Sequence, residues 1–62
     1  MTKKHFTALA AALLRSKPDK DSNQYQTELF IWQRTVKEIA AVCRTHNPAF
    51  NQDRFYEASG LR

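Results

Sequence analysis

Residues 25–43, YQTELFIWQRTVKEIAAVC, decide the fold, because their large apolar residues are spaced alternately four and three positions apart. This spacing places the apolar residues on one face of an α-helix. The row covers fewer than three heptads, so it predicts the central helix of a small bundle rather than a long coiled coil. We name these residues the inner row: Tyr25, Leu29, Trp32, Val36, Ile39 and Cys43.

The central helix is expected to begin between Asn23 and Thr27 and to end near His46. Asp21, Ser22, Asn23 and Thr27 could each cap its start, and Asn23 with Gln26 three positions later forms a weak capping-box pattern. Pro48 predicts the end of the helix, because proline has no backbone N–H to continue it.

The segment KKHFTALAAALLR, residues 3–15, predicts a helix on the N-terminal side of the inner row, with Thr2 as its N-cap. Its apolar residues recur every three or four positions and form one stripe: Phe6, Leu9, Ala10, Leu13 and Leu14. The polar segment SKPDKDSN, residues 16–23, then ends the helix, since Pro18 cannot extend it.

The segment NPAFNQDRFYEASG, residues 47–60, carries the signals of one short helix with defined ends. Asn51 is expected to cap it, and Phe50 and Phe55 flank the cap as a hydrophobic staple. Gly60 is suited to end the helix in the left-handed conformation. We expect this helix to fold back over the inner row through four apolar residues: Phe50, Phe55, Ala58 and Leu61.

These segments predict an all-α protein in which residues 1–62 form a single small domain. Two antiparallel helices would be joined across the Pro18 break and closed by the short C-terminal helix. A domain of this length buries only about 60% of the surface that its unfolded chain exposes, so its stability is marginal. Cys43 is the single cysteine, which excludes an intramolecular disulfide.

The residues give no basis for expecting a metal, a cofactor or catalysis. His5, Cys43 and His46 are the only soft metal ligands, and they lack the paired short spacings of zinc sites. The single glycine, Gly60, cannot form a glycine-rich phosphate loop. Cys43 with His46 could form a nucleophilic pair, but Cys43 continues the inner row and is predicted to be a core thiol. We therefore predict that the protein is not an enzyme.

The sequence predicts a cytoplasmic protein that does not enter a membrane. No stretch approaches the roughly 18 apolar residues that a membrane span requires. Residues 1–20 have a basic front and a short apolar run, as a signal peptide does. Their apolar residues keep helical spacing, however, and without them little core would be left.

The formal net charge is +4, with ten basic and six acidic residues, and this balance favours anionic partners. Nucleic acid is therefore one candidate partner, contacted through phosphates. Acidic residues are interspersed among the basic ones, however, and this mixture favours a solvated surface over a nucleic-acid site. The basic residues concerned are Lys3, Lys4, Arg15, Lys17, Lys20, Arg34, Lys37 and Arg44.

Protein binding is the other candidate, and it depends on Phe30 and Ile31, which project away from the inner row. An exposed aromatic residue beside arginine and lysine has the composition of a protein interface. Two interpretations stay open: a binding surface, or a wide buried arc that covers both residues. A homodimer that pairs Phe30 and Ile31 across a two-fold axis is a further alternative. The predicted partner-binding residues are Phe30, Ile31, Arg34, Lys37 and Arg44.

Two parts of the chain resemble small accessory proteins of phages, prophages and plasmids. One is KHFTALAAAL, residues 4–13, and the other is CRTHNPAFNQDRFYEASGL, residues 43–61, which fits the pattern N-P-x-F-(N/D)-x-x-R-F-x-x-A-x-G. The matching residues of the second part are Asn47, Pro48, Phe50, Asn51, Arg54, Phe55, Ala58 and Gly60. Ser59 stands at a position where we expect such proteins to have cysteine, which weakens the idea of a metal or redox role there.

The resemblance covers about half of the chain and implies a mobile-element accessory protein of bacteria, with no catalytic residue. By analogy, such a protein would bind a host protein in the bacterial cytoplasm and inhibit a defence system or another host machine. The alternative function is a small basic module that binds DNA or RNA.

Overall fold

The computed structural model describes residues 3–61, and these residues form three helices and no strand. The helices are α1 (Lys3–Arg15), α2 (Tyr25–His46) and α3 (Gln52–Ser59). The all-α prediction is therefore confirmed, and each helix begins or ends within about two residues of its expected position. Thr2, the predicted N-cap of α1, lies outside the described residues.

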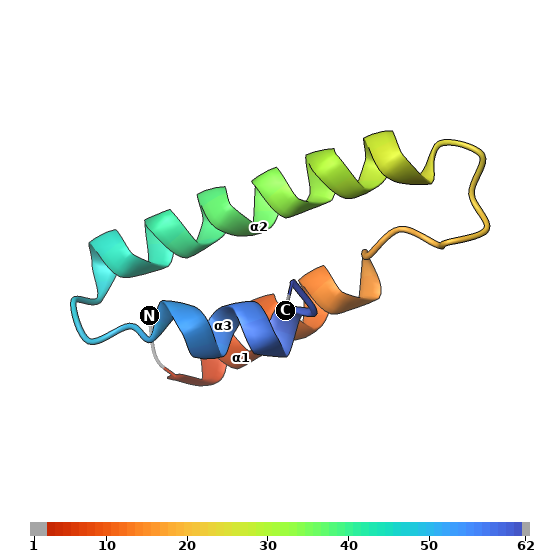
Figure 1. The fold of residues 1–62 in the computed structure, drawn as a ribbon. Helices are drawn as coiled ribbons and strands as arrows, with labels where there is room; N and C mark the ends of the chain where they lie inside the picture. The colour runs from red at the N-terminus through yellow and green to blue at the C-terminus, as the bar shows by residue number, and fades with distance from the viewer. Residues whose placement is uncertain (1–2, 62) are drawn as a thin grey trace.

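The long helix α2 sets the shape of the molecule, which measures 38 × 17 × 15 Å (Figure 1). Its 22 residues rise about 1.5 Å each, so it spans most of the long dimension. α1 runs antiparallel to α2, and α3 lies on the same side of α2 as α1 does (Figure 1). The backbone of α3 lies near that of α1 over a longer stretch than near that of α2, so α3 packs mainly along α1 rather than across the inner row.

The inner row faces the core, as the spacing predicted. Trp32 is only 6% exposed, and Val36 and Cys43 are almost completely buried. The other members of the row, Tyr25, Leu29 and Ile39, are half-buried. The remaining core residues come from all three helices: Ala10, Leu13, Ala40, Phe55 and Tyr56.

Trp32 links the three helices. Its indole N–H donates to the Leu13 carbonyl near the end of α1, at 2.9 Å. The Lys17 ammonium lies 5.5 Å from the centre of its ring and donates to the Gly60 carbonyl, at 2.8 Å, just beyond α3. A buried indole N–H needs a partner, and this one ties α2 to α1 at the point where the chain leaves α1.

The predicted capping box of Asn23 and Gln26 is wrong, because α2 begins after Gln24 without a side-chain cap on that residue. Ser22 acts instead, since its hydroxyl accepts from the Gln24 amide at 3.3 Å and donates to the Glu28 carboxylate at 3.0 Å. A serine hydroxyl can form such a turn without being the N-cap itself.

The ends of α3 agree with the prediction. The Asn51 side chain accepts from the Arg54 amide at 3.1 Å, and the rings of Phe50 and Phe55 pack with centroids 5.3 Å apart. The predicted inward face is partly wrong, because Ala58 is exposed while Tyr56 and Ser59 are buried. A short helix that contacts both α1 and α2 buries a wider arc than one helix face alone.

Gly60 is needed for the end of α3. Its φ of +89° is left-handed, and the amides of Gly60 and Leu61 donate to the Glu57 and Tyr56 carbonyls, which forms a Schellman motif. A Cβ atom at this position would come within 2.7 Å of a Leu14 methyl group. Glycine therefore satisfies both the backbone conformation and the close packing of α3 against α1.

Candidate functional site

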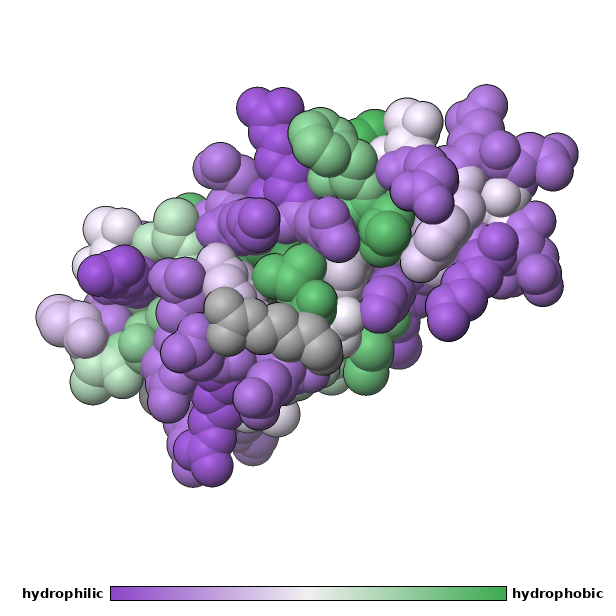
Figure 2. All heavy atoms as spheres, viewed as in Figure 1, coloured by the Kyte–Doolittle hydropathy of each residue, from purple (hydrophilic) through white to green (hydrophobic). Residues whose placement is uncertain are grey.

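The side of α2 that faces away from the core carries the residues predicted to bind a partner, and we name this set the outer surface: Phe30, Ile31, Arg34, Lys37 and Arg44. All five side chains are exposed. Phe30 is 66% exposed and Ile31 is 58% exposed, so neither is covered by α1 or α3. Of the two open interpretations, the wide buried arc is therefore excluded. Figure 2 shows apolar side chains reaching the surface over α2, among hydrophilic ones.

The structure brings together part of the outer surface. Phe30, Arg34 and Lys37 line a shallow depression of about 210 Å³ with Gln33. They share one side of the helix because they are spaced at three and four residues. Ile31 lies about 100° around the helix from Phe30 and does not line the depression. Arg44 follows two turns after Lys37 on the same side, outside the depression.

Two exposed apolar residues were not predicted. Val42 is 54% exposed, and it lies three helical turns after Ile31 on the same side of α2. Leu14 is half exposed at the end of α1, although its spacing predicted burial. The position of Val42 could have been found from its spacing to Ile31, whereas the exposure of Leu14 depends on where α3 ends.

A second hollow lies between α1, the α2–α3 connection and α3, and we name it the α1–α3 cleft. It has a volume of about 340 Å³. No local pattern in the sequence predicts this cleft, because its walls come from segments far apart in the chain. It is lined by Lys3, Phe6, Thr7, Ala10, Asn47, Ala49, Phe50, Asn51, Arg54, Phe55 and Ala58.

Three phenylalanine rings pack one against the next along this cleft. The centroids of the Phe6 and Phe50 rings are 4.9 Å apart in an edge-to-face arrangement, and Phe50 in turn packs on Phe55. Such pairs stabilise a fold beyond the area that they bury. Phe55 is buried, whereas Phe6 and Phe50 are half-buried and keep part of each ring accessible. The rings therefore join α1 to α3 and also form an apolar wall.

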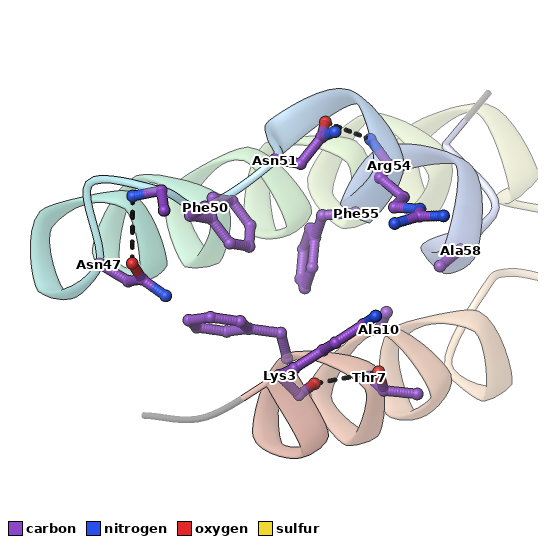
Figure 3. A pocket seen from close by; sticks show the side chains of 11 residues that line it. Lys3, Thr7, Ala10, Asn47, Phe50, Asn51, Arg54, Phe55 and Ala58 are labelled. Carbon is purple, nitrogen blue, oxygen red and sulfur yellow. Dashed lines mark hydrogen bonds between the residues drawn. The ribbon is translucent and has the colours of Figure 1, made fainter.

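The polar side chains of the cleft are two cations, two amides and the hydroxyl of Thr7, which donates to the Lys3 carbonyl at 3.0 Å. Figure 3 shows the side chains of Lys3, from α1, and Arg54, from α3, extending into the space between these helices. The Asn47 and Asn51 side-chain oxygens accept backbone amide protons from Ala49 and Arg54, each at 3.1 Å. No acidic residue is among the described residues that line the cleft.

Cys43 lies in the core, as predicted, with only 1% of its surface exposed. Burial raises the pKa of its thiol, so the nucleophilic thiolate is disfavoured. Among residues 3–61, no group of three or more histidine, cysteine, aspartate or glutamate residues could hold a metal ion. Ser59, which is also buried, donates its hydroxyl proton to the Tyr56 carbonyl at 3.0 Å.

Comparisons of the chain with protein-family models, with curated proteins and with solved structures give no match. Within residues 3–61, no helix has the length and apolar character needed to cross a membrane. The geometry of the outer surface and of the α1–α3 cleft is therefore the basis for the functional proposals.

Proposed function

We propose that this protein is a non-enzymatic accessory protein of a phage or another mobile element, and that it binds a bacterial host protein through the outer surface of α2. The observation that carries the proposal is the 66% exposure of Phe30 beside Arg34 and Lys37. A domain of this size has a small core, and a phenylalanine side chain that is exposed to water adds almost nothing to its stability. Aromatic residues and arginine are the side chains enriched at protein interfaces.

The place of action would be the cytoplasm of the host bacterium, and the outcome would be inhibition of a defence system or another host machine. These two steps rest on the resemblance of residues 4–13 and 43–61 to mobile-element proteins and on analogy. The contact itself rests on the exposed residues. Phe30 would enter a pocket of the partner, and Arg34 and Lys37 would meet acidic groups around it.

We expect Phe30→Ala and Arg34→Glu each to abolish capture of the host protein in a quantitative pull-down from bacterial lysate. Both residues are exposed, so circular dichroism should show unchanged helicity and unchanged thermal unfolding. Lys20→Glu is the matched control, because it makes the same reversal of charge as Arg34→Glu at an exposed position outside α2. Capture that is indifferent to both test variants, or lost equally in the control, would contradict the proposal.

The alternative functions predict different results. A nucleic-acid-binding module would bind generic duplex DNA at about 50 mM salt, and its affinity would fall steeply as salt rises. A homodimer through Phe30 and Ile31 would show a mass in light scattering that increases with concentration and is lost in Phe30→Ala. Our proposal predicts no DNA binding and a constant monomer mass.

A further inference from the structure

The α1–α3 cleft has no part in the proposed function, and none of its lining residues belongs to the outer surface. We propose that it is a binding site for a small aromatic carboxylate. Its volume, about 340 Å³, lies near the lower end of the range of small-molecule sites, which is about 300–1,000 Å³. A ligand with one or two rings would fill a hollow of this size.

The walls of the cleft suit a flat apolar body. Phe6 and Phe50 leave part of each ring accessible, and the buried Phe55 continues the aromatic wall. Ala10 and Ala58, on the facing helices α1 and α3, are too small to fill the space between them (Figure 3). The ligand rings would pack against the phenylalanine rings in the offset or edge-to-face geometry that aromatic pairs prefer.

The polar groups select a negative charge. Lys3 and Arg54 approach the cleft from different helices, and no lining residue among those described opposes them with a carboxylate. The guanidinium of arginine matches a carboxylate with two parallel hydrogen bonds. Asn47 and Asn51 each use the side-chain oxygen for a backbone amide, so the NH2 group of each is a donor. The cleft therefore offers positive charge and hydrogen-bond donors around an apolar wall.

The test is an NMR titration of the intact chain with 2-naphthoate and with its neutral analogue 2-naphthamide. We expect saturable shifts of backbone amides around Phe6, Phe50 and Arg54, and an affinity for naphthoate at least about tenfold higher than for the amide. A tenfold ratio corresponds to about 1.4 kcal/mol, which is in the range of one charge-assisted hydrogen bond. Absence of a saturable shift at millimolar naphthoate, equal affinity for both compounds, or shifts confined to α2 would each overturn the proposal.

Two pairs of variants locate the site. Arg54→Gln should reduce the affinity for naphthoate about tenfold and leave that for naphthamide unchanged, because it removes the charge and keeps the backbone amide that binds Asn51. Ala58→Leu should abolish binding of both compounds by filling the cleft from an exposed position. Arg15→Gln and Ala8→Leu are matched changes at exposed positions away from the cleft, and both should bind like the original protein. Equal effects of a test variant and its control would contradict the proposed binding site. That result would leave the proposed contact of the outer surface with a host protein standing, because the pull-down tests it separately.

Discussion

Replacing Trp32 with alanine is expected to destabilise the fold severely. The side chain is 6% exposed and ties α2 to α1 through its hydrogen bond to the Leu13 carbonyl. Truncation of a buried tryptophan removes about 3–5 kcal/mol. A domain of 62 residues has roughly 3–9 kcal/mol of total stability. Thermal unfolding followed by circular dichroism should therefore show a loss of at least about 12 °C, or no cooperative transition at all.

Trp32→Phe separates the hydrogen bond from the packing. Phenylalanine keeps most of the buried ring but has no N–H to donate. The Leu13 carbonyl also accepts from the Ser16 amide, at 3.1 Å, so it is not left unpaired. The lost hydrogen bond should then remove about 1 kcal/mol, which is much less than the alanine variant removes. Equal loss in the two variants, or a loss below about 1 kcal/mol for Trp32→Ala, would contradict this account of the core.

The second large effect is expected for Phe55→Ala, compared with the identical change at Phe30. Phe55 is 4% exposed and packs against Phe50 in the staple that begins α3. Its truncation should remove about 3–5 kcal/mol and release α3 from α1. Phe30 is exposed, so Phe30→Ala should change the free energy of unfolding by less than about 0.5 kcal/mol. Chemical denaturation of both variants measures the difference.

The two phenylalanine variants test where the core lies without any assumption about partners. Both delete the same atoms, so hydrophobicity and helix propensity change equally. A destabilisation by Phe30→Ala as large as that by Phe55→Ala would show that the outer surface is part of the core. The proposed contact with a host protein would then have no exposed aromatic residue to rest on.

The inner row could be predicted because it depends on the period of one helix. Once Trp32, Val36 and Cys43 share a face, burial of one requires burial of the others. The ends of α3 were equally predictable, since the Asn51 cap, the staple and the Gly60 turn involve residues close together in the chain. The exposure of Phe30 and Ile31 was one of two open interpretations. The amount of surface that α1 and α3 cover decided between them.

The packing of α3 could not be predicted, because the sequence does not fix how a short helix divides its contacts between two neighbours. This is why Tyr56 and Ser59 are buried and Ala58 is exposed. The α1–α3 cleft was missed for the same reason. It exists only because the fold brings Phe6 next to Phe50, which belongs to a distant part of the chain. No local spacing in either segment indicates that contact.

The central claim is that the inner row of α2 faces the core, which leaves the outer surface free for a partner. Trp32 is the only tryptophan, so its fluorescence reports on one member of that row. We predict that its emission is blue-shifted in buffer relative to the chain in guanidinium, and that iodide quenches it strongly only after unfolding. The claim would be contradicted if circular dichroism shows intact helices in buffer but the emission and quenching of Trp32 are the same there as in guanidinium.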